Sequence, residues 1–327
     1  AVDSLPAVDA GPADEVCFDI ALDSYNLAGS NSIGSSFWSV KSGPGTVMTF
    51  GDDTSPITTF NTDANGFYEL YLEATNGVCS AKDSVEIMLN PYPTASFTAS
   101  TEICDGSEAV LTFSLSGEAP FEVVYFDGVI NDTIVSSLNT IEELLMPSIT
   151  TTYTLVSATD NNSCTIYPNI DQTVLVTPQP IADAGSDAEL CFDLVNDVYN
   201  LQASQNVGSG LWTSSPAGLT FSSLTDPTAT VSSSAYGTFE LIWTVDTSIC
   251  SDADTLYLSL NEIPTAVIST TDLEICIGSS AELTFTMTGM PPFSVTYNDG
   301  SDVITVNGIS TNDTTISVSP SFDISYN

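Results

Sequence analysis

Several stretches of the chain alternate apolar and polar residues with a period of two. In 239–245, FELIWTV, every second residue is Phe, Leu, Trp or Val, and 111–115, LTFSL, follows the same rule. Alternation of this kind, rich in Thr, Val and Tyr, is typical of strands with one buried face. Turn dipeptides such as Asp127-Gly128 and Asp299-Gly300 fall between the runs. Because no stretch shows three turns of helical periodicity, we predict an all-β protein.

A long repeat divides the chain. Residues 17–38, CFDIALDSYNLAGSNSIGSSFW, return as 191–212, CFDLVNDVYNLQASQNVGSGLW, at an offset of 174. Further along, NGFYEL at 65–70 matches YGTFEL at 236–241 at an offset of 171, so a loop has lost three residues. A repeat of this length defines a structural unit, which we name the A type.

A second, B-type unit separates the two A units. Its Cys104 matches Cys276, and LTF at 111–113 matches LTF at 283–285. Units of roughly 85 residues with about seven short strands fit a β-sandwich. We therefore expect a fragment of a longer A-B-A-B array. The predicted parts are 1–4 as the tail of a preceding domain, 5–90 as A, 91–178 as B, 179–262 as A, and 263–327 as a B domain truncated at its C-terminal end.

The charge of the chain is strongly one-sided. It has 42 acidic residues, only Lys41 and Lys82 as cations, and no Arg or His. Nucleic acid is excluded as a partner, because neutralising phosphates requires Lys and Arg. No stretch reaches the roughly 18 apolar residues of a membrane span, so we expect no direct membrane insertion. Two interpretations of the acidity stay open: a solvated, self-repelling surface, or binding of divalent cations and adaptation to salt.

The seven cysteines become regular once the repeat is applied. Each complete unit has one early and one late cysteine, and Cys276 has none following it in the chain. This predicts disulfides within domains, Cys17–Cys79, Cys104–Cys164 and Cys191–Cys250, with Cys276 bonded to a partner beyond the C-terminus. Disulfides indicate an oxidising, extracellular location. Buried free cysteines are the alternative, whereas zinc is disfavoured by the absence of His and of Cys-x-x-Cys.

The units resemble known modules. Ala182 to Asp187, ADAGSD, followed by Leu211-Trp212-Thr213 and by YGTFELIWTV at 236–245, resembles a polycystic-kidney-disease (PKD) type immunoglobulin-like domain. The B unit is similar to modules that alternate with PKD-like ones in giant surface proteins of Bacteroidota, including gliding-motility adhesins. The resemblance implies a tandem array of immunoglobulin/PKD-like β-sandwiches on a bacterial cell surface. Four triplets, each made of Asp, then Ser or Thr, then an apolar residue or Thr, also resemble the O-glycosylation signal of Bacteroidota. The resemblance implies that the acceptors are Ser84, Thr133, Thr255 and Thr314.

Few residues point to chemistry. Without His or Arg, the usual triads and phosphate clamps cannot be built, so we predict no enzyme activity and no required cofactor. Calcium is the best candidate ligand, because it prefers carboxylate oxygens, and Asp9 and Asp183 lie at the starts of the two A units. Surface carboxylates that only solvate are the alternative. The three tryptophans lie in strand patterns, which favours the core over sugar stacking.

Two functions are consistent with these observations. The first is a stalk segment of an extracellular surface filament or adhesin, whose partners are neighbouring repeats, surface glycans or other cells. Pro-containing linkers at 90–93, NPYP, and 177–180, TPQP, favour semi-rigid joints. The second is a set of accessory carbohydrate-binding modules of a secreted glycan-degrading enzyme. The regular A-B-A-B order favours the stalk.

Overall fold

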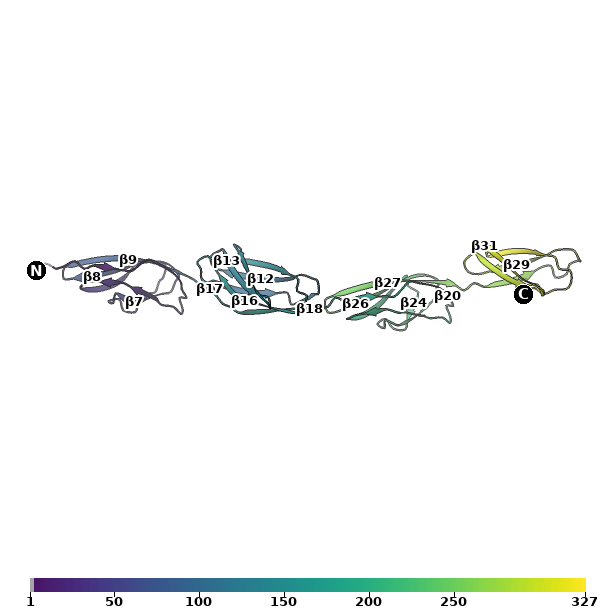
Figure 1. Ribbon diagram of the computed structural model, residues 1–327, viewed down its shortest axis with the longest axis horizontal. Coiled ribbons are helices and arrows are strands. Elements are labelled where there is room, and N and C mark those ends of the chain that lie inside the picture. Colours follow the sequence, from purple (N-terminus) through teal and green to yellow (C-terminus); the bar gives the residue numbers. More distant parts are fainter. Residues whose placement is uncertain (1–2) are drawn as a thin grey trace. The chain divides into compact units, whose positions relative to one another are not determined.

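The computed structural model describes residues 3–327, and every regular element in that range is a β-strand. The prediction of an all-β protein is therefore confirmed. No helix in this range is long and apolar enough to cross a membrane. The chain forms two compact units, Ala1–Thr177 and Pro178–Asn327, which are described separately (Figure 1). Of the predicted N-terminal tail, residues 1 and 2 lie outside the described range.

Residues 5–90 form two sheets around one hydrophobic core. One sheet has the order β2-β9-β8-β5, the other has the order β3-β7-β6, and β1 pairs with β4. The strands are β1 (Val8–Asp9), β2 (Asp14–Cys17), β3 (Tyr25–Ala28), β4 (Ser30–Asn31), β5 (Ser35–Ser42), β6 (Met48–Phe50), β7 (Ile57–Thr62), β8 (Gly66–Asn76) and β9 (Cys79–Asn90).

The core of this first A domain follows from the alternation in β8. Tyr68, Leu70 and Leu72 are fully buried, and the residues between them are half-exposed. Phe60, on β7 of the opposite sheet, meets the Tyr68 ring edge-on with centroids 5.2 Å apart. Burying each such side chain contributes about 2 kcal/mol, so the two sheets are held together by apolar contacts along this strand.

The topology is that of an immunoglobulin-like sandwich. Strands β5, β8 and β9 correspond to the C, F and G strands of that fold, and β3, β7 and β6 to its B, E and D strands. The short strand β2 runs parallel to β9, with Cys17 opposite Asn90. This register places Cys17 beside the last residue of the domain's last strand.

Residues 91–177 form the first B domain, with a core that includes Phe113 and Phe121. A three-stranded sheet, β10-β12-β15, faces a six-stranded one of order β11-β18-β16-β13-β14, with β17 beside β16. The strands are β10 (Thr94–Ala99), β11 (Glu102–Cys104), β12 (Ala109–Ser116), β13 (Phe121–Phe126), β14 (Asn131–Ser136), β15 (Thr140–Leu145), β16 (Thr151–Thr159), β17 (Thr165–Ile166) and β18 (Ile170–Thr177).

The second unit begins with a repetition of the A fold. Its sheets have the orders β20-β27-β26-β23 and β21-β25-β24, and β19 pairs with β22. The strands are β19 (Ala182–Asp183), β20 (Ala188–Phe192), β21 (Tyr199–Asn200), β22 (Ser204–Gln205), β23 (Ser209–Ser215), β24 (Leu219–Phe221), β25 (Thr230–Ser233), β26 (Gly237–Asp246) and β27 (Ser251–Glu262). Here β20 runs parallel to β27, with Cys191 opposite Asn261, as Cys17 faces Asn90 in the first A domain.

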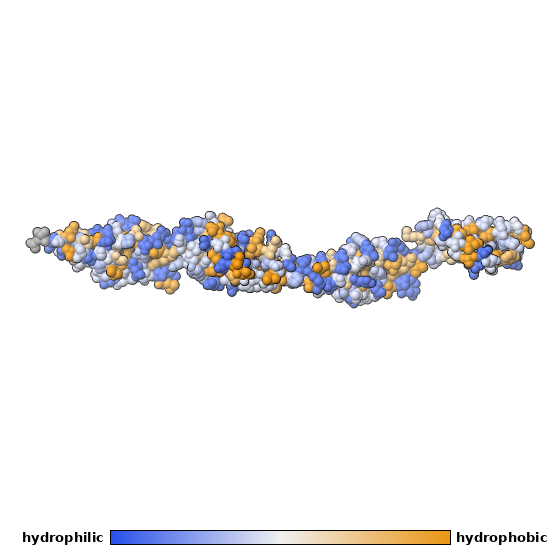
Figure 2. Space-filling model, viewed as in Figure 1, coloured by the Kyte–Doolittle hydropathy of each residue, from blue (hydrophilic) through white to orange (hydrophobic). Residues whose placement is uncertain are grey.

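Residues 263–327 contain five described strands around a smaller core. One sheet, β28-β29-β32, is complete relative to the first B domain, but the other consists only of β30 and β31. The strands are β28 (Ala266–Thr270), β29 (Ala281–Met287), β30 (Phe293–Asn298), β31 (Val303–Ile309) and β32 (Asp313–Val318). Figure 2 shows apolar and polar residues mixed over the visible face of each domain.

The two A domains fill one core position in different ways. In the second, the Trp243 and Trp212 rings meet at an angle of 44° with centroids 5.0 Å apart, and the Trp243 ring occupies the space beside Gly210. A Cβ atom on Gly210 would lie 1.8 Å from the Trp243 ring. In the first A domain the repeat-equivalent residues are Ser36 and Leu72. A small residue on one strand therefore accompanies the large ring on its neighbour.

Replacing Gly210 with Ser is expected to destabilise the second A domain by about 1–3 kcal/mol, because overpacking forces the Trp243 ring out of place. Denaturant unfolding followed by tryptophan fluorescence measures the loss. The matched variant carries both Gly210→Ser and Trp243→Leu, the combination found in the first A domain, and should recover most of the stability. Equal stability of the single variant and the native chain would contradict this account.

Candidate functional site: a disulfide-bonded joint between domains

A disulfide joins the first A domain to the B domain that follows it. Cys17 and Cys164 are bonded with an S–S distance of 2.10 Å and a Cα–Cα distance of 5.5 Å, across 147 positions of sequence. Cys104 and Cys250 are disulfide-bonded as well, whereas Cys79, Cys191 and Cys276 are free thiols. The predicted pairings Cys17–Cys79, Cys104–Cys164 and Cys191–Cys250 are therefore wrong. The predicted partner of Cys276 beyond the C-terminus stays a prediction.

The register of the last strand explains the error. Cys17 lies opposite Asn90, the last residue of β9, whereas Cys79 is the first residue of that strand. At about 3.3 Å per residue, the two cysteines lie about 36 Å apart along the sheet, far beyond the roughly 6 Å that a disulfide spans. Cys191 and Cys250 are separated along β27 in the same way.

The first B domain separates its cysteines as well. Cys104 lies beside Thr177 on the parallel pair β11 and β18. Cys164 follows the far end of β16, the strand that lies next to β18. The early cysteine of a domain thus lies at its C-terminal end and the late cysteine at its N-terminal end. At the joint between the first A domain and the first B domain, the early Cys17 of one therefore meets the late Cys164 of the other.

Polar contacts hold Cys17 at the end of the first A domain. The Phe18 N–H donates to the Asn90 carbonyl at 2.7 Å, and the Asn90 side-chain amide donates to Glu15 at 2.8 Å. The Tyr25 hydroxyl, on β3, donates at 2.9 Å to Asp14, which lies on β2 together with Glu15 and Cys17. Burial, reinforced by this hydrogen bond, raises the pKa of Tyr25 to about 12, so the phenol remains a hydrogen-bond donor to a higher pH than an ordinary tyrosine.

The Glu15–Asn90 contact has counterparts in two other domains. In each of them the strand that carries the early cysteine also runs parallel to the last strand. In the second A domain, the Asn261 amide donates to Glu189 at 3.0 Å, beside Cys191. In the first B domain, the Thr177 hydroxyl donates to Glu102 at 2.5 Å, beside Cys104. A Glu two residues before the cysteine thus binds the polar residue opposite that cysteine.

Asp160 organises the other side of the joint. Its side chain is 5% exposed, and Oδ1 accepts the N–H groups of Asn162 at 3.0 Å and Cys164 at 3.1 Å. Its own N–H donates to the Cys164 carbonyl at 3.1 Å. The loop 160–164 is therefore closed on a buried carboxylate, and it presents the fully buried Cys164 to Cys17.

Gly117 allows the linker to approach this loop. Its φ is +126°, a region that favours glycine. A Cβ atom there would lie 3.1 Å from Asp160 Oδ2 and 3.2 Å from Pro93 Cβ. In the last domain, Gly289 has a φ of +102° and lies against Pro264 in the same way. Gly117 and Gly289, and likewise Pro93 and Pro264, are repeat-equivalent, and both glycines leave room for the proline that precedes their domain.

The calcium candidates Asp9 and Asp183 are exposed, and each carboxylate already accepts a backbone N–H, from Gly11 and Gly185, at 2.9 Å. Within residues 3–327, no group of three or more acidic, cysteine or histidine side chains is arranged to hold a metal ion. Carboxylates do lie beside both candidates, but they accept backbone N–H groups. Asp83 accepts the Ala10 N–H next to Asp9, and Asp252 and Asp254 accept the N–H groups on either side of Asp183. Calcium binding stays a prediction.

The glycosylation candidates lie on strands β9, β14, β27 and β32. Ser84 and Thr133 are exposed, whereas Thr255 and Thr314 are half-buried. The aspartate before Ser84 has a structural use, because Asp83 accepts the Ala10 N–H at 2.8 Å, and Asp254 accepts the Ala184 N–H likewise. This contact explains why the aspartate recurs in both A domains, so its recurrence is no evidence for a glycan. Glycosylation stays a prediction.

The tryptophans lie in the cores, as the strand patterns indicate. Trp38, Trp212 and Trp243 are at most 1% exposed. The indole N–H of Trp38 donates to the Pro56 carbonyl and that of Trp212 to the Asp226 carbonyl, both at 3.1 Å. None of the three rings is therefore available for stacking on a sugar.

No protein-family model and no curated protein matches the sequence. Solved tandem immunoglobulin structures are similar to the chain. The I-band fragment I67–I69 from titin has 10% identity and a TM-score of 0.46, covering 79% of this chain and 99% of its own. The N-terminal four Ig domains of Dscam1 isoform 6.9 have 15% identity and a TM-score of 0.28, covering 96% and 92%. Immunoglobulin domains 1–5 of Sidekick-1 have 12% identity and a TM-score of 0.35, covering 91% and 68%.

Digestion with a Glu-specific protease under non-reducing conditions should show the joint disulfide directly. Cleavage after glutamates isolates Cys17 in peptide 16–69, Cys164 in 144–189 and Cys79 in 74–86. We expect a linked pair of 16–69 and 144–189 in mass spectrometry that separates on reduction. A linked pair of 16–69 and 74–86 would contradict the structure.

Replacing Asp160 with Ala should destabilise the first B domain by about 1–3 kcal/mol, because buried N–H groups of the 160–164 loop lose their acceptor. Thermal unfolding measures the effect, and the Cys17–Cys164 bond should be reduced faster by dithiothreitol. Glu122→Ala removes an exposed carboxylate from the same domain and serves as the matched control. If both variants behave like the native chain, Asp160 does not hold the loop.

Proposed function

We propose that the chain is a structural stalk segment of an extracellular bacterial surface filament or adhesin, in which disulfides cross the joints between domains. The observation that carries the proposal is the Cys17–Cys164 bond, which unites two successive immunoglobulin-like domains. A structural disulfide forms and persists in an oxidising environment. The strongly acidic composition keeps an extracellular chain soluble. The sequence resemblance to gliding-motility adhesins of Bacteroidota implies that this stalk lies on a bacterial cell surface.

The joint disulfide limits bending. Two covalent connections run between the domains: the linker Pro91-Tyr92-Pro93, and the Cys17–Cys164 bond. A single linker acts as a hinge, whereas a second connection at a separate point removes most of the rotation about it. The buried Asp160 loop fixes one end of this second connection, and the Glu15–Asn90 contact fixes the other.

The same bond changes the path of mechanical force. Tension that enters at the N-terminus reaches Cys17 and then passes directly to Cys164 through the disulfide. Residues 18–90 carry no load while the bond is intact. The hydrophobic core around the buried Phe60 lies in this bypassed part. A stalk built in this way stays folded and keeps its length under load.

The alternative function is that of accessory carbohydrate-binding modules of a secreted glycan-degrading enzyme. It receives no support from the tryptophans, because all three are buried. A joint disulfide is also of little use to modules that bind one by one. Strong and selective binding on a glycan array would favour this alternative over the stalk.

Force spectroscopy with handles at both termini tests the stalk proposal. The oxidised chain should show no unfolding step from residues 18–90, whereas the Cys17→Ser/Cys164→Ser variant should show one. The step should release about 240 Å, the extended length of these residues, because Phe18 and Asn90 are hydrogen-bonded neighbours in the folded domain. Addition of reductant to the native chain should produce the same step. Identical traces from the native chain, with and without reductant, would overturn the proposed load path.

A further inference from the structure

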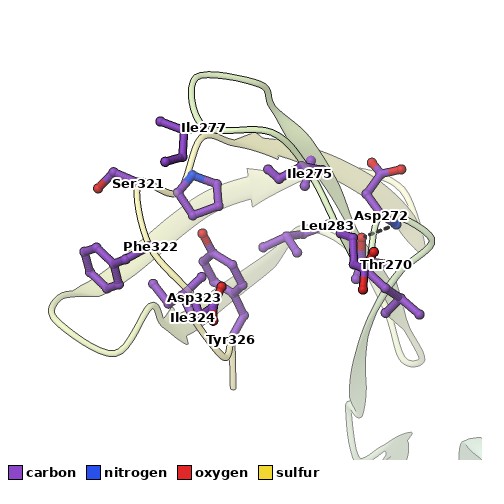
Figure 3. Close-up of a pocket in the computed structure, with 14 residues that line it drawn as sticks. Thr270, Asp272, Ile275, Ile277, Leu283, Ser321, Phe322, Asp323, Ile324 and Tyr326 are labelled. Carbon is purple, nitrogen blue, oxygen red and sulfur yellow. Dashed lines mark hydrogen bonds between the residues drawn. The ribbon is translucent and has the colours of Figure 1, made fainter.

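A groove of about 690 Å³ opens on the domain formed by residues 263–327, between a wall with Ile275 and Ile277 and a wall with Phe322 and Tyr326 (Figure 3). In the first B domain, β16 and β18 fill the equivalent space in the larger sheet. The groove therefore exposes side chains of a sandwich core and gives no indication of a ligand. A smaller hollow elsewhere on the chain has a different lining.

This smaller hollow, of about 140 Å³, opens on the second A domain between the segment 184–187 and β21. Two of its lining residues, Ala184 and Leu256, are at most 1% exposed and provide an apolar base. The other side chains around it are polar, and they belong to Ser186, Asp187, Tyr199 and Gln202. An apolar base beneath a few convergent polar groups is typical of a small-molecule site.

In the first A domain, an aspartate occupies the equivalent position. There the hydroxyl of Tyr25, the repeat-equivalent of Tyr199, donates to Asp14 Oδ2 at 2.9 Å. The second A domain has Ala188 in place of Asp14. Among the residues that the structure describes, no group accepts a hydrogen bond from the Tyr199 hydroxyl. The hollow thus lies beside a phenol whose internal acceptor is missing.

The main chain is the same at the two positions, so the difference lies in the side chains. A Cβ atom on Gly11 would lie 3.5 Å from the carbonyl oxygen of Ala28, and one on Gly185 would lie 3.4 Å from that of Gln202. Three further exchanges make the second position more polar: Pro12, Ala13 and Ala28 correspond to Ser186, Asp187 and Gln202. Because the first A domain packs with apolar residues there, the fold does not require these polar groups.

The polar lining indicates the class of ligand. Asp187 Oδ1 accepts the Tyr257 N–H at 2.8 Å, which leaves Oδ2 to a ligand. An anion is disfavoured beside this carboxylate in a chain of net charge −40. An ammonium ion only donates hydrogen bonds, so it leaves the Tyr199 proton without an acceptor. Adjacent hydroxyl groups of a neutral ligand accept and donate, and therefore suit both Tyr199 and Asp187.

The volume limits the ligand to a single small ring. A protein cavity of about 150 Å³ accommodates a benzene ring, and the hollow is nearly as large. A six-membered sugar ring matches this size, with its C–H groups against Ala184 and Leu256 and its hydroxyl groups toward the polar side chains. The hollow has no room for a second sugar unit.

We propose that the hollow lined by Asp187, Tyr199 and Gln202 binds one neutral six-membered sugar ring through adjacent hydroxyl groups. One hydroxyl takes the place that the Asp14 carboxylate has in the first A domain, and it accepts the Tyr199 proton. A neighbouring hydroxyl donates to Asp187 Oδ2. The proposal does not rest on the stalk function, and weak binding of one sugar ring is compatible with a stalk.

Saturation-transfer NMR on the whole chain tests the proposal, with glucose, galactose, mannose and their methyl glycosides as probes and methylammonium as the cationic comparison. We expect at least one sugar to give a saturable signal with a Kd on the order of 1–10 mM. A methyl glycoside that binds as well as its free sugar identifies the end of a glycan chain as the source. Binding of the free sugar alone identifies a monosaccharide, and either result supports the site. No saturable signal from any sugar, or binding of methylammonium only, would overturn the proposal.

Giving the second A domain the aspartate of the first locates the site. Ala188→Asp should weaken sugar binding by about tenfold or more, because the new carboxylate takes the Tyr199 proton. Tyr199→Phe should weaken it by about fivefold. The first A domain already combines Asp14 with Tyr25, so Ala188→Asp suits the fold, and thermal unfolding checks this. Binding of native strength in both variants would show that the sugar binds elsewhere.

A double variant, Asp14→Ala/Ala188→Asp, moves the carboxylate from one A domain to the other at constant charge. It frees the Tyr25 hydroxyl but leaves apolar neighbours around it, at Pro12, Ala13 and Ala28. We expect it to bind sugar no better than Ala188→Asp alone. Recovery of native binding in the double variant would contradict the roles assigned to Asp187 and Gln202.

Discussion

The parallel pairing of a short early strand with the last strand of the same domain determines where the cysteines lie. In the first A domain this pairing sets Cys17 opposite Asn90, the residue from which the chain enters the linker. An early residue is thereby carried the full length of the sandwich to its C-terminal end. Without the parallel strand, Cys17 would lie at no fixed point relative to the next domain, and Cys164 would have no thiol to meet.

The same constraint separates what could be predicted from what could not. The alternation in 239–245 and the repeat at an offset of 174 were sufficient for the all-β fold and for the equivalence of Cys17 and Cys191. Which cysteines form disulfides with each other was not predictable. The spacing of the cysteines in the sequence fits a bond within one domain and a bond to the next domain equally well. The strand Asp14–Cys17 has no fully buried residue, so no apolar pattern indicated its direction or its partner. The roles of Asp160 and Gly117 were missed for a related reason, since both depend on contacts across the joint.

Some of the many acidic residues have a structural role, because aspartate side chains accept backbone N–H groups in the turns. Asp127 accepts the N–H groups of Ile130 and Val129 at 2.7 Å, and Asp299 accepts those of Asp302 and Ser301 at 2.7 and 2.9 Å. These backbone hydrogen bonds lower the pKa of both aspartates. The charged form is favoured in the folded state, so the stabilisation is present above the ordinary pKa and is lost as the pH falls through the lowered one. Carboxylates close turns in this way without a cationic partner, which a chain with only two lysines could seldom provide.

A joint disulfide has a structural cost as well as a benefit. A domain whose disulfide is internal can unfold under load and refold without affecting its neighbours, so that it acts as an extensible spring. The Cys17–Cys164 bond removes that extensibility from the first A domain, because it couples the ends of two domains and leaves residues 18–90 outside the load path. Stiffness in such an array is therefore a property of consecutive domains in pairs, and no single domain possesses it.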